Sequence, residues 1–133
     1  MKDVTHASGV IIRDGKILLL LRLPTKKYFP FFWTVPGGKA DVDEELSEVV
    51  TREVCEETGM HFVLTRHFRD YYLIHDDIHL MGHVFLGTAS GEIVVGKDEV
   101  ETYAWFTYDE AVKLQLAHYV RSLLEDLQKE KLL

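Results

Sequence analysis

Apolar and polar residues are arranged along this 133-residue chain in a pattern that predicts several strands and two helices. Residues 6–12 and 16–22 are predicted strands, and Arg13-Asp14-Gly15 between them is typical of a hairpin turn. Residues 17–21 form a continuous apolar run, as expected of a strand that is covered on both faces. Further strands are expected at residues 31–35, 62–74, 78–86, 92–95 and 102–106, with a hairpin turn at Asp76-Asp77.

Two segments have the spacing of amphipathic helices. In the first, residues 46–57, the side chains of Leu46, Val50 and Val54 fall on one face, and Gly59 is expected to end the helix. A second helix is expected over residues 108–128. Its apolar face is formed by Val112, Leu116, Tyr119, Val120, Leu123 and Leu124. Together with the strands, these helices predict a mixed fold.

The first helix carries glutamates where ordinary helix physics does not place them. With successive side chains about 100° apart, Glu53 and Glu57 fall within the apolar arc and Glu56 lies at its margin. Glu48 lies opposite, as a solvated carboxylate should. Carboxylates that face the interior repel one another and lose hydration, so they need compensating positive charge. Arg52 supplies one such charge, and a divalent metal best balances the remainder.

The same stretch contains a spaced motif that resembles the Nudix box. Gly38 is followed after five residues by Glu44, and after seven more by the run Arg52-Glu53-Val54-Cys55-Glu56-Glu57-Thr58-Gly59-Met60. Every specified position of the pattern G-x5-E-x7-R-E-U-x-E-E-x-G-U is filled, where U is a bulky apolar residue. The preceding residues 33–37, Trp-Thr-Val-Pro-Gly, also resemble the family. The resemblance implies a Nudix fold, an α/β/α sandwich in which a mixed sheet lies between helices, and the length suits one domain over residues 1–133.

The resemblance also assigns roles to residues of the box. The metal ligands that it implies are Glu53, Glu56, Glu57 and the backbone carbonyl of Gly37 or Gly38. Oxygen ligands of this kind suit Mg²⁺, and Mn²⁺ accepts the same ligands. Arg52 and Glu44 are implied to form a supporting salt bridge that orients the ligand glutamates.

One further acidic residue outside the box is expected to act as a general base. Glu99 best resembles the position that the MutT-like branch of the family uses, counting back from Trp105. Asp98 and Glu101 flank it as alternatives, and Glu56 is the alternative within the box.

Three residues are candidates for contact with the substrate. Arg22, at the end of the second predicted strand, resembles family arginines that bind phosphates, and Lys39 is a weaker candidate for the same role. Phe32 belongs to an aromatic cluster at residues 31–33 that is suited either to the core or to stacking on a nucleobase.

His79 and His83 share one face of a predicted strand, but four strand residues span about 13 Å, too far for one zinc ion.

The composition of the chain limits which binding partners and which cellular compartment are expected for the protein. The net charge of −7 argues against non-specific binding of nucleic acid. It is compatible with a small phosphorylated substrate that is bound together with metal ions. No apolar run reaches the roughly 18 residues of a membrane span, and no signal peptide is evident. The lone Cys55 suits a reducing cytosol, so a cytoplasmic protein is expected, as a monomer or a homodimer.

These features predict Mg²⁺-dependent hydrolysis of a nucleoside-diphosphate linkage, foremost of a nucleoside triphosphate to the monophosphate and pyrophosphate. The alternative substrates are ADP-ribose or a nucleotide sugar, and a dinucleoside polyphosphate. ADP-ribose is disfavoured, because His75 occupies the place of the proline expected in ADP-ribose hydrolases. A dinucleoside polyphosphate is disfavoured, because Tyr71 and Tyr72 lie short of the tyrosine expected in hydrolases of that substrate. A catalytically inactive nucleotide-binding module is disfavoured, because no glutamate of the box is lost.

Overall fold

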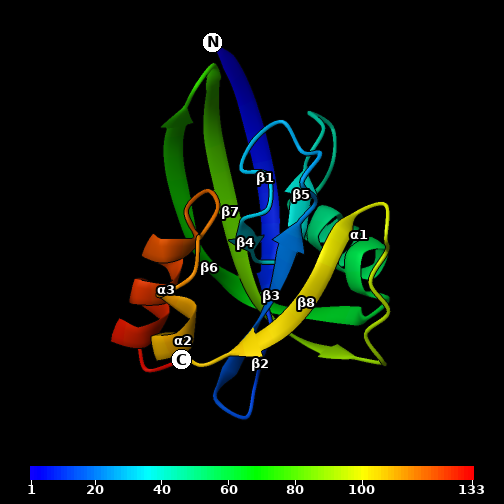
Figure 1. Cartoon of the computed structure of the whole chain (residues 1–133). Helices are drawn as coiled ribbons and strands as arrows, with labels where there is room; N and C mark the ends of the chain where they lie inside the picture. The colour runs from blue at the N-terminus through cyan, green and yellow to red at the C-terminus, as the bar shows by residue number, and fades with distance from the viewer.

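The computed structural model describes all 133 residues and contains two four-stranded sheets between helices (Figure 1). The first sheet has the order β5 (Gly37–Lys39), β1 (Lys2–Val10), β7 (Ile78–Ser90) and β6 (His61–His75). In the second sheet, β3 (Lys16–Arg22) pairs with β2 (Ile12–Arg13), β4 (Trp33–Thr34) and β8 (Val100–Phe106). The helices are α1 (Leu46–Thr58), α2 (Tyr108–Ala111) and α3 (Val120–Lys129). Because β1 and β7 are parallel and the other pairs antiparallel, the predicted mixed fold is confirmed, with its strands divided between two sheets.

Strand β3 is buried on both of its faces, as its continuous apolar run predicts. Leu18 and Leu20 belong to a core with Val50 of α1, whereas Leu19 belongs to a second core with Leu124 of α3. Successive side chains of a strand point to opposite faces, so this one strand contributes to both cores. Figure 1 shows the consequence, with α1 on one side of the strands and α2 and α3 on the other.

The two predicted hairpin turns are present. Asp14 and Gly15 join β2 to β3 with φ values of 51° and 74°, which is the left-handed conformation that a tight two-residue hairpin turn requires. Asp76 has a φ of 51°, and with Asp77 it joins β6 to β7. The strand predicted over residues 6–12, however, is two strands in the structure, because it is interrupted at Ile11. There the chain passes from the first sheet to the second.

Helix α1 agrees with its prediction. It ends at Thr58, and Gly59 follows with a φ of 73° while its N–H donates to the carbonyl of Cys55. Glu53 and Glu57 are half-buried beside the valines, whereas Glu48 is exposed. The unusual placement of the glutamates is therefore real.

Three other predicted elements need correction. The long helix over 108–128 is broken, because backbone groups of Gln115 and Ala117 bond to Trp33 and His118 has a left-handed φ of 52°. Residues 92–95 form no strand, and the amide of Val94 instead donates to the carbonyl of Thr58. The strand over 31–35 shortens to β4, since Phe31 also has a positive φ of 61°.

Strand β5 was not expected, since Pro36-Gly37-Gly38 indicates a stop. Its three residues pair antiparallel with His6, Ala7 and Ser8 of β1. A side chain at Gly37 would place its Cβ 2.5 Å from the carbonyl oxygen of Ala7, so glycine permits the pairing. This pairing brings the residues before α1 against the first sheet. No helix of the chain combines the length and apolar character needed to cross a membrane.

Candidate active site

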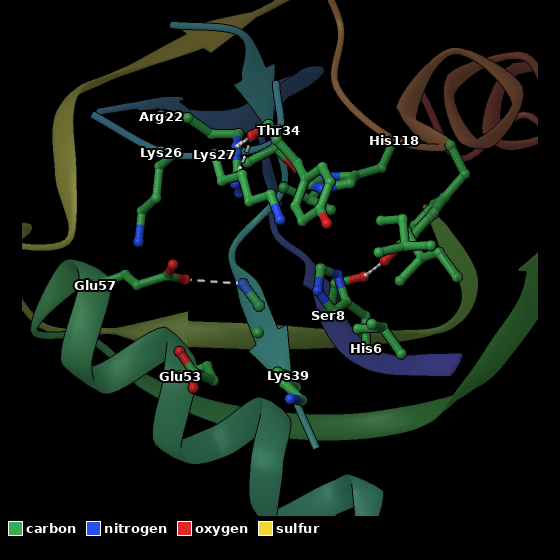
Figure 2. Close-up of a pocket in the computed structure, with 18 of the residues that line it drawn as sticks. His6, Ser8, Arg22, Lys26, Lys27, Thr34, Lys39, Glu53, Glu57 and His118 are labelled. Carbon is green, nitrogen blue, oxygen red and sulfur yellow. Dashed lines mark hydrogen bonds between the residues drawn. The ribbon is translucent and has the colours of Figure 1, made fainter. Parts of the chain in front are cut away.

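A cavity of about 420 Å³ lies where β1, β5 and the start of β7 meet α1 and the loop between β3 and β4 (Figure 2). Its acidic lining residues are Glu53, Glu57 and Glu99, and its basic ones are Lys2, Arg22, Lys26, Lys27 and Lys39. Its other polar and aromatic lining residues include His6, Ser8, Tyr28, Thr34, His118 and Tyr119. In Figure 2 the two glutamates of α1 lie on one side of the cavity and His6 and His118 on the other.

The carboxylates of α1 meet the backbone of β5. The N–H of Gly37 donates to Oε1 of Glu57 over 2.8 Å. At Gly38, an added Cβ would lie within 2.7 Å of both carboxylate oxygens of Glu53, so any other residue there would displace the Glu53 carboxylate from its present position. Burial raises the pKa of Glu53, and the negative charge of Glu56 adds to this effect. Burial raises the pKa of Glu57 well above its usual value, despite the bond from Gly37.

Arg52 balances these charges from the exposed side of the helix. Its guanidinium lies 3.1 Å from Glu44, 3.1 Å from Glu53 and 3.5 Å from Glu56. The pairing of Arg52 with Glu44 that the sequence indicates is therefore present. Glu44 also accepts a bond from the N–H of Asp41, which is the largest cause of its lowered pKa. Glu56 is exposed and is not among the residues that line the cavity.

Glu99 reaches the same carboxylates from a different part of the chain. A turn in which the N–H of Glu99 donates to the carbonyl of Gly96 over 2.8 Å brings its side chain to the cavity. Its charge helps to raise the pKa of both Glu53 and Glu57. Its neighbours Asp98 and Glu101 are exposed and do not line the cavity.

The predicted substrate-binding residues divide into two groups. Arg22 and Lys39 both line the cavity. The guanidinium of Arg22 also donates to the carbonyls of Tyr28, at 2.9 Å, and Phe29, at 3.2 Å, so it holds the loop above the cavity. Phe32 is not part of the lining, and its ring packs against that of Phe29 with 5.6 Å between centroids.

Two histidines of the cavity wall were not foreseen from the sequence. The rings of His6 and His118 lie edge to face, 5.2 Å apart. Burial lowers the pKa of His6 to about 4, aided by the charges of Arg22 and Lys39. Burial also lowers the pKa of His118 to about 2. Both rings are thus neutral near pH 7. The only sequence signal is the alternation of His6 and Ser8 on one face of a strand, because His118 falls within the helix that does not form.

The family model of the NUDIX domain matches residues 4–127. This chain belongs to the Nudix hydrolase family. It is 30% identical to a protein named 8-oxo-dGTP diphosphatase from Buchnera aphidicola, over 97% of this chain and 96% of that protein. It is also 30% identical to an uncharacterized Nudix hydrolase, YfcD of Escherichia coli, over 79% of this chain, and it spans 60% of the length of that relative.

A solved structure of a relative supports the same assignment. The MutT NUDIX hydrolase from Burkholderia pseudomallei has a TM-score of 0.84 and 30% identity to this Nudix hydrolase, covering 94% of this chain and 98% of that one. The predicted family and fold are therefore confirmed. The chain is a MutT-like Nudix enzyme of the pyrophosphohydrolase class.

The neutral histidines generate a prediction about stability and pH. The folded protein keeps His118 uncharged, whereas the unfolded chain takes up a proton there below about pH 6.5. Acidification from about pH 6.5 towards pH 4 should therefore destabilise the fold. The substitution His118→Asn tolerates the φ of 52° and removes the proton uptake. It should reduce the slope of the unfolding free energy against pH by up to about 1.4 kcal/mol per pH unit.

Urea unfolding at a series of pH values measures this slope. The matched control is His61→Asn, which removes an exposed histidine at the start of β6 and tests whether any histidine substitution has the same effect. Equal slopes for wild type and His118→Asn would show that His118 takes up no extra proton on unfolding.

Proposed function

We propose that this Nudix hydrolase converts a nucleoside triphosphate to the monophosphate and pyrophosphate, with Mg²⁺ as its cation and Mn²⁺ as a substitute. The observation that carries the proposal is the arrangement of one cavity, with carboxylates on one side, basic residues along it and neutral rings on the other side. A nucleotide has the complementary arrangement of a charged phosphate chain and a flat, neutral base. The similarity to a protein named 8-oxo-dGTP diphosphatase supports a triphosphate as the substrate.

The carboxylates fit a divalent cation in chemistry and in placement. Glu53 and Glu57 line the same cavity, and burial together with repulsion from neighbouring glutamates raises the pKa of each, so Arg52 and Arg22 only partly offset their charges. Their oxygens are hard ligands of the kind that Mg²⁺ prefers. We assign Glu53, Glu56, Glu57 and the carbonyl of Gly37 or Gly38 to hold the cation. When bound, it neutralises phosphate oxygens and makes a water molecule more acidic.

The basic residues are suited to the phosphate chain. Arg22 is fixed by two loop carbonyls, so its guanidinium presents a positioned charge rather than a mobile one. Lys39, on β5, lines the cavity next to the glycines that contact the glutamates. In this proposal both residues bind phosphate oxygens and hold the reacting phosphorus near the carboxylates. His6 and His118, being neutral, are suited to the uncharged base or sugar.

The proton of the attacking water needs an acceptor. We assign this role to Glu99, because it lines the cavity within electrostatic reach of Glu53 and Glu57 yet belongs to a separate loop. Arg52 and Glu44 act as positioning residues, since Arg52 contacts Glu53 and Glu56 from the side away from the cavity. The exposed Cys55 is free, which agrees with a cytoplasmic location, and we propose that location.

The first test of this function is a panel of nucleoside triphosphates, nucleotide sugars and dinucleoside polyphosphates assayed with Mg²⁺. We expect turnover of at least one triphosphate, loss of turnover with EDTA and recovery with Mg²⁺ or Mn²⁺. In water enriched in ¹⁸O, the label should enter the monophosphate, because attack on the inner phosphorus releases intact pyrophosphate. Label in the pyrophosphate, or cleavage of nucleotide sugars alone, would refute the triphosphate proposal while leaving hydrolysis itself intact.

The substitution Glu57→Gln tests the carboxylate assignment. It preserves the shape of the side chain and removes its charge, so kcat should fall by more than about a hundredfold, or about 2.7 kcal/mol. Glu48→Gln is the matched control, because it removes a carboxylate from the exposed face of the same helix and should change kcat less than about twofold. Circular dichroism checks that both variants fold. A Glu57→Gln enzyme with more than a tenth of the normal kcat would exclude Glu57 as a ligand.

The substitution Glu99→Gln tests the general base. A base acts on the transition state more than on substrate binding, so kcat should fall by about 100-fold or more with little change in KM. Asp98→Asn and Glu101→Gln, in neighbours outside the cavity, should have mild effects. Near-normal kcat in all three variants would move the role of base to Glu56. Steady-state kinetics at saturating Mg²⁺ distinguishes these outcomes.

A further inference from the structure

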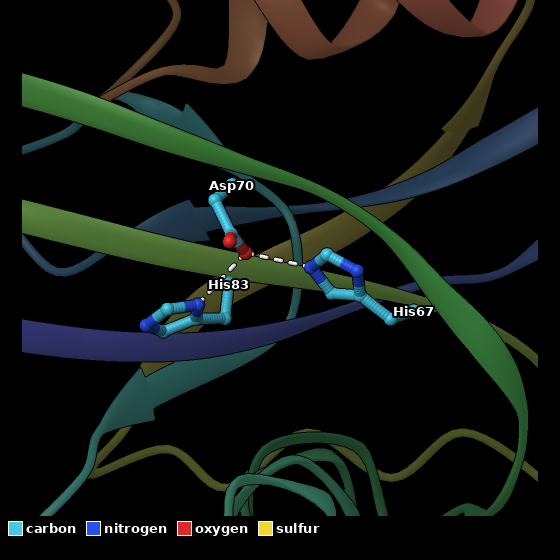
Figure 3. Close-up of side chains that lie close together, drawn as sticks. All are labelled: His67, Asp70 and His83. Carbon is cyan, nitrogen blue, oxygen red and sulfur yellow. Dashed lines mark hydrogen bonds and ion pairs between the residues drawn. The ribbon is translucent and has the colours of Figure 1, made fainter.

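A group of side chains with metal-ligating atoms lies outside the cavity lining. His67 and Asp70 of β6 and His83 of β7 converge on one another (Figure 3). We propose that this His–Asp–His cluster, formed by His67, Asp70 and His83, is a binding site for a transition-metal cation of the zinc class. The site is independent of the Mg²⁺ site proposed above.

The distances between the three ligand atoms are already close to those between ligands that share one bound ion. Oδ1 of Asp70 lies 2.6 Å from Nε2 of His67 and 2.7 Å from Nδ1 of His83. One atom from each residue can be chosen so that all three lie within 4.8 Å of one another. Around a tetrahedral Zn²⁺ with bonds of about 2.0 Å, ligand atoms lie about 3.3 Å apart. Small rotations of exposed side chains are enough to reach that spacing.

An irregularity in β6 creates the cluster. Residues three apart in a regular strand point to opposite faces, which would separate His67 from Asp70. The register between β6 and β7 shifts between His67 and Arg69, so that His67 lies opposite Phe85 and Asp70 lies opposite His83. Because Phe85 and His83 are two residues apart, both partners share one face of the sheet. Such bulges commonly re-aim a side chain at a functional position.

The bulge also has a packing role that explains why it is stable. Phe68, between the two ligand residues, is buried in the core on the α3 side. On the opposite face, the ring of His67 packs edge to face against Phe85, which belongs to the core on the α1 side. The ligand residues are thus held by both cores, although His67 and Asp70 are exposed enough for an ion to enter.

Ligand chemistry separates this site from the carboxylates of α1. Two imidazoles and one carboxylate suit Zn²⁺ and leave a fourth position for water, whereas Mg²⁺ prefers oxygen ligands alone. The position is also distinct. His83 lies on the same face of the first sheet as Ala7 and the Gly38 position that meets Glu53, but two strands away. His83, Ala7 and Gly38 lie on neighbouring strands in one row, so about 10 Å of backbone separates the cluster from the β5 glycines.

The test is titration of Zn²⁺ into the full-length protein carrying Glu53→Gln and Glu57→Gln, so that the box contributes no high-affinity site. Isothermal titration calorimetry should report one Zn²⁺ per chain, and Co²⁺ should give the visible absorption of a four-coordinate site. Adding His67→Ala or His83→Ala should weaken Zn²⁺ binding by at least about tenfold. His79→Ala is the matched control, because His79 lies on the same strand and face but pairs with Asp3, and it should leave binding unchanged.

Thermal unfolding with and without Zn²⁺ provides a second measurement. Zn²⁺ should raise the Tm of the background protein and of His79→Ala, because an ion that binds only the folded state stabilises it. Should His83→Ala fail to fold, His67→Gln in the exposed part of β6 replaces it. Absence of Zn²⁺ binding in the background protein, or binding that survives both histidine substitutions, would overturn the proposal. Asp70 would then act only as a hydrogen-bonding clamp between two histidines. Neither result bears on nucleotide hydrolysis, which the Mg²⁺ assays test separately.

Discussion

The close contact between the backbone of β5 and the glutamate face of α1 is the constraint on which the rest of the structure depends. The amide of Gly37 bonds to Glu57, and the carboxylate of Glu53 lies against Gly38, where a Cβ would otherwise be. Because β5 also pairs with β1, this contact fixes the helix against the first sheet. The direction of the carboxylates and part of the cavity wall follow from one short strand of three residues, while the valines of α1 pack in the core with Ala7, Leu18 and Phe62.

The contact carries an electrostatic cost that the fold only partly offsets. Glu53 and Glu57 alternate along α1 with fully buried valines, so their charges are drawn towards the interior and the pKa of each rises through burial. Arg52 bridges three carboxylates, but it does so from the solvent side, where its attraction is screened. The chain therefore tolerates a local excess of negative charge for the sake of its chemistry. Such tolerance is typical of functional sites.

The sequence predicts well those structural features that depend on residues close together in the chain. The spacing of α1, its end at Gly59 and the turns at Asp14-Gly15 and Asp76-Asp77 depend on local geometry, and all are confirmed. The family pattern added the residues of the box, although their chemical roles stay predictions. What the sequence does not reveal depends on distant partners. Residues 108–128 have the spacing of one long helix, yet the backbone of Trp33 pairs with residues 115 and 117 and breaks it.

Part of the cavity wall cannot be predicted from the sequence for the same reason, because it also depends on residues that are distant in the chain. His118 enters the cavity because the break in the predicted helix gives it a left-handed backbone, and no local pattern signals that. The division into two sheets has the same origin. Ile11 interrupts what alternation alone predicts as one strand, and each half pairs with a different set of strands.

The loop between β3 and β4 has a consequence for how this enzyme can diverge. It supplies Lys26, Lys27 and Tyr28 to the cavity, while Arg22 holds it by two of its carbonyls. It takes no part in the pairing of β5 with β1 or in the packing of α1. Tyr28 of the loop also packs against the core beside α3, so the lysines at 26 and 27 are the cavity residues of this loop that the fold constrains least. Changes in substrate range are accordingly easiest to reach at these two lysines, and a library for altered specificity is best concentrated on them.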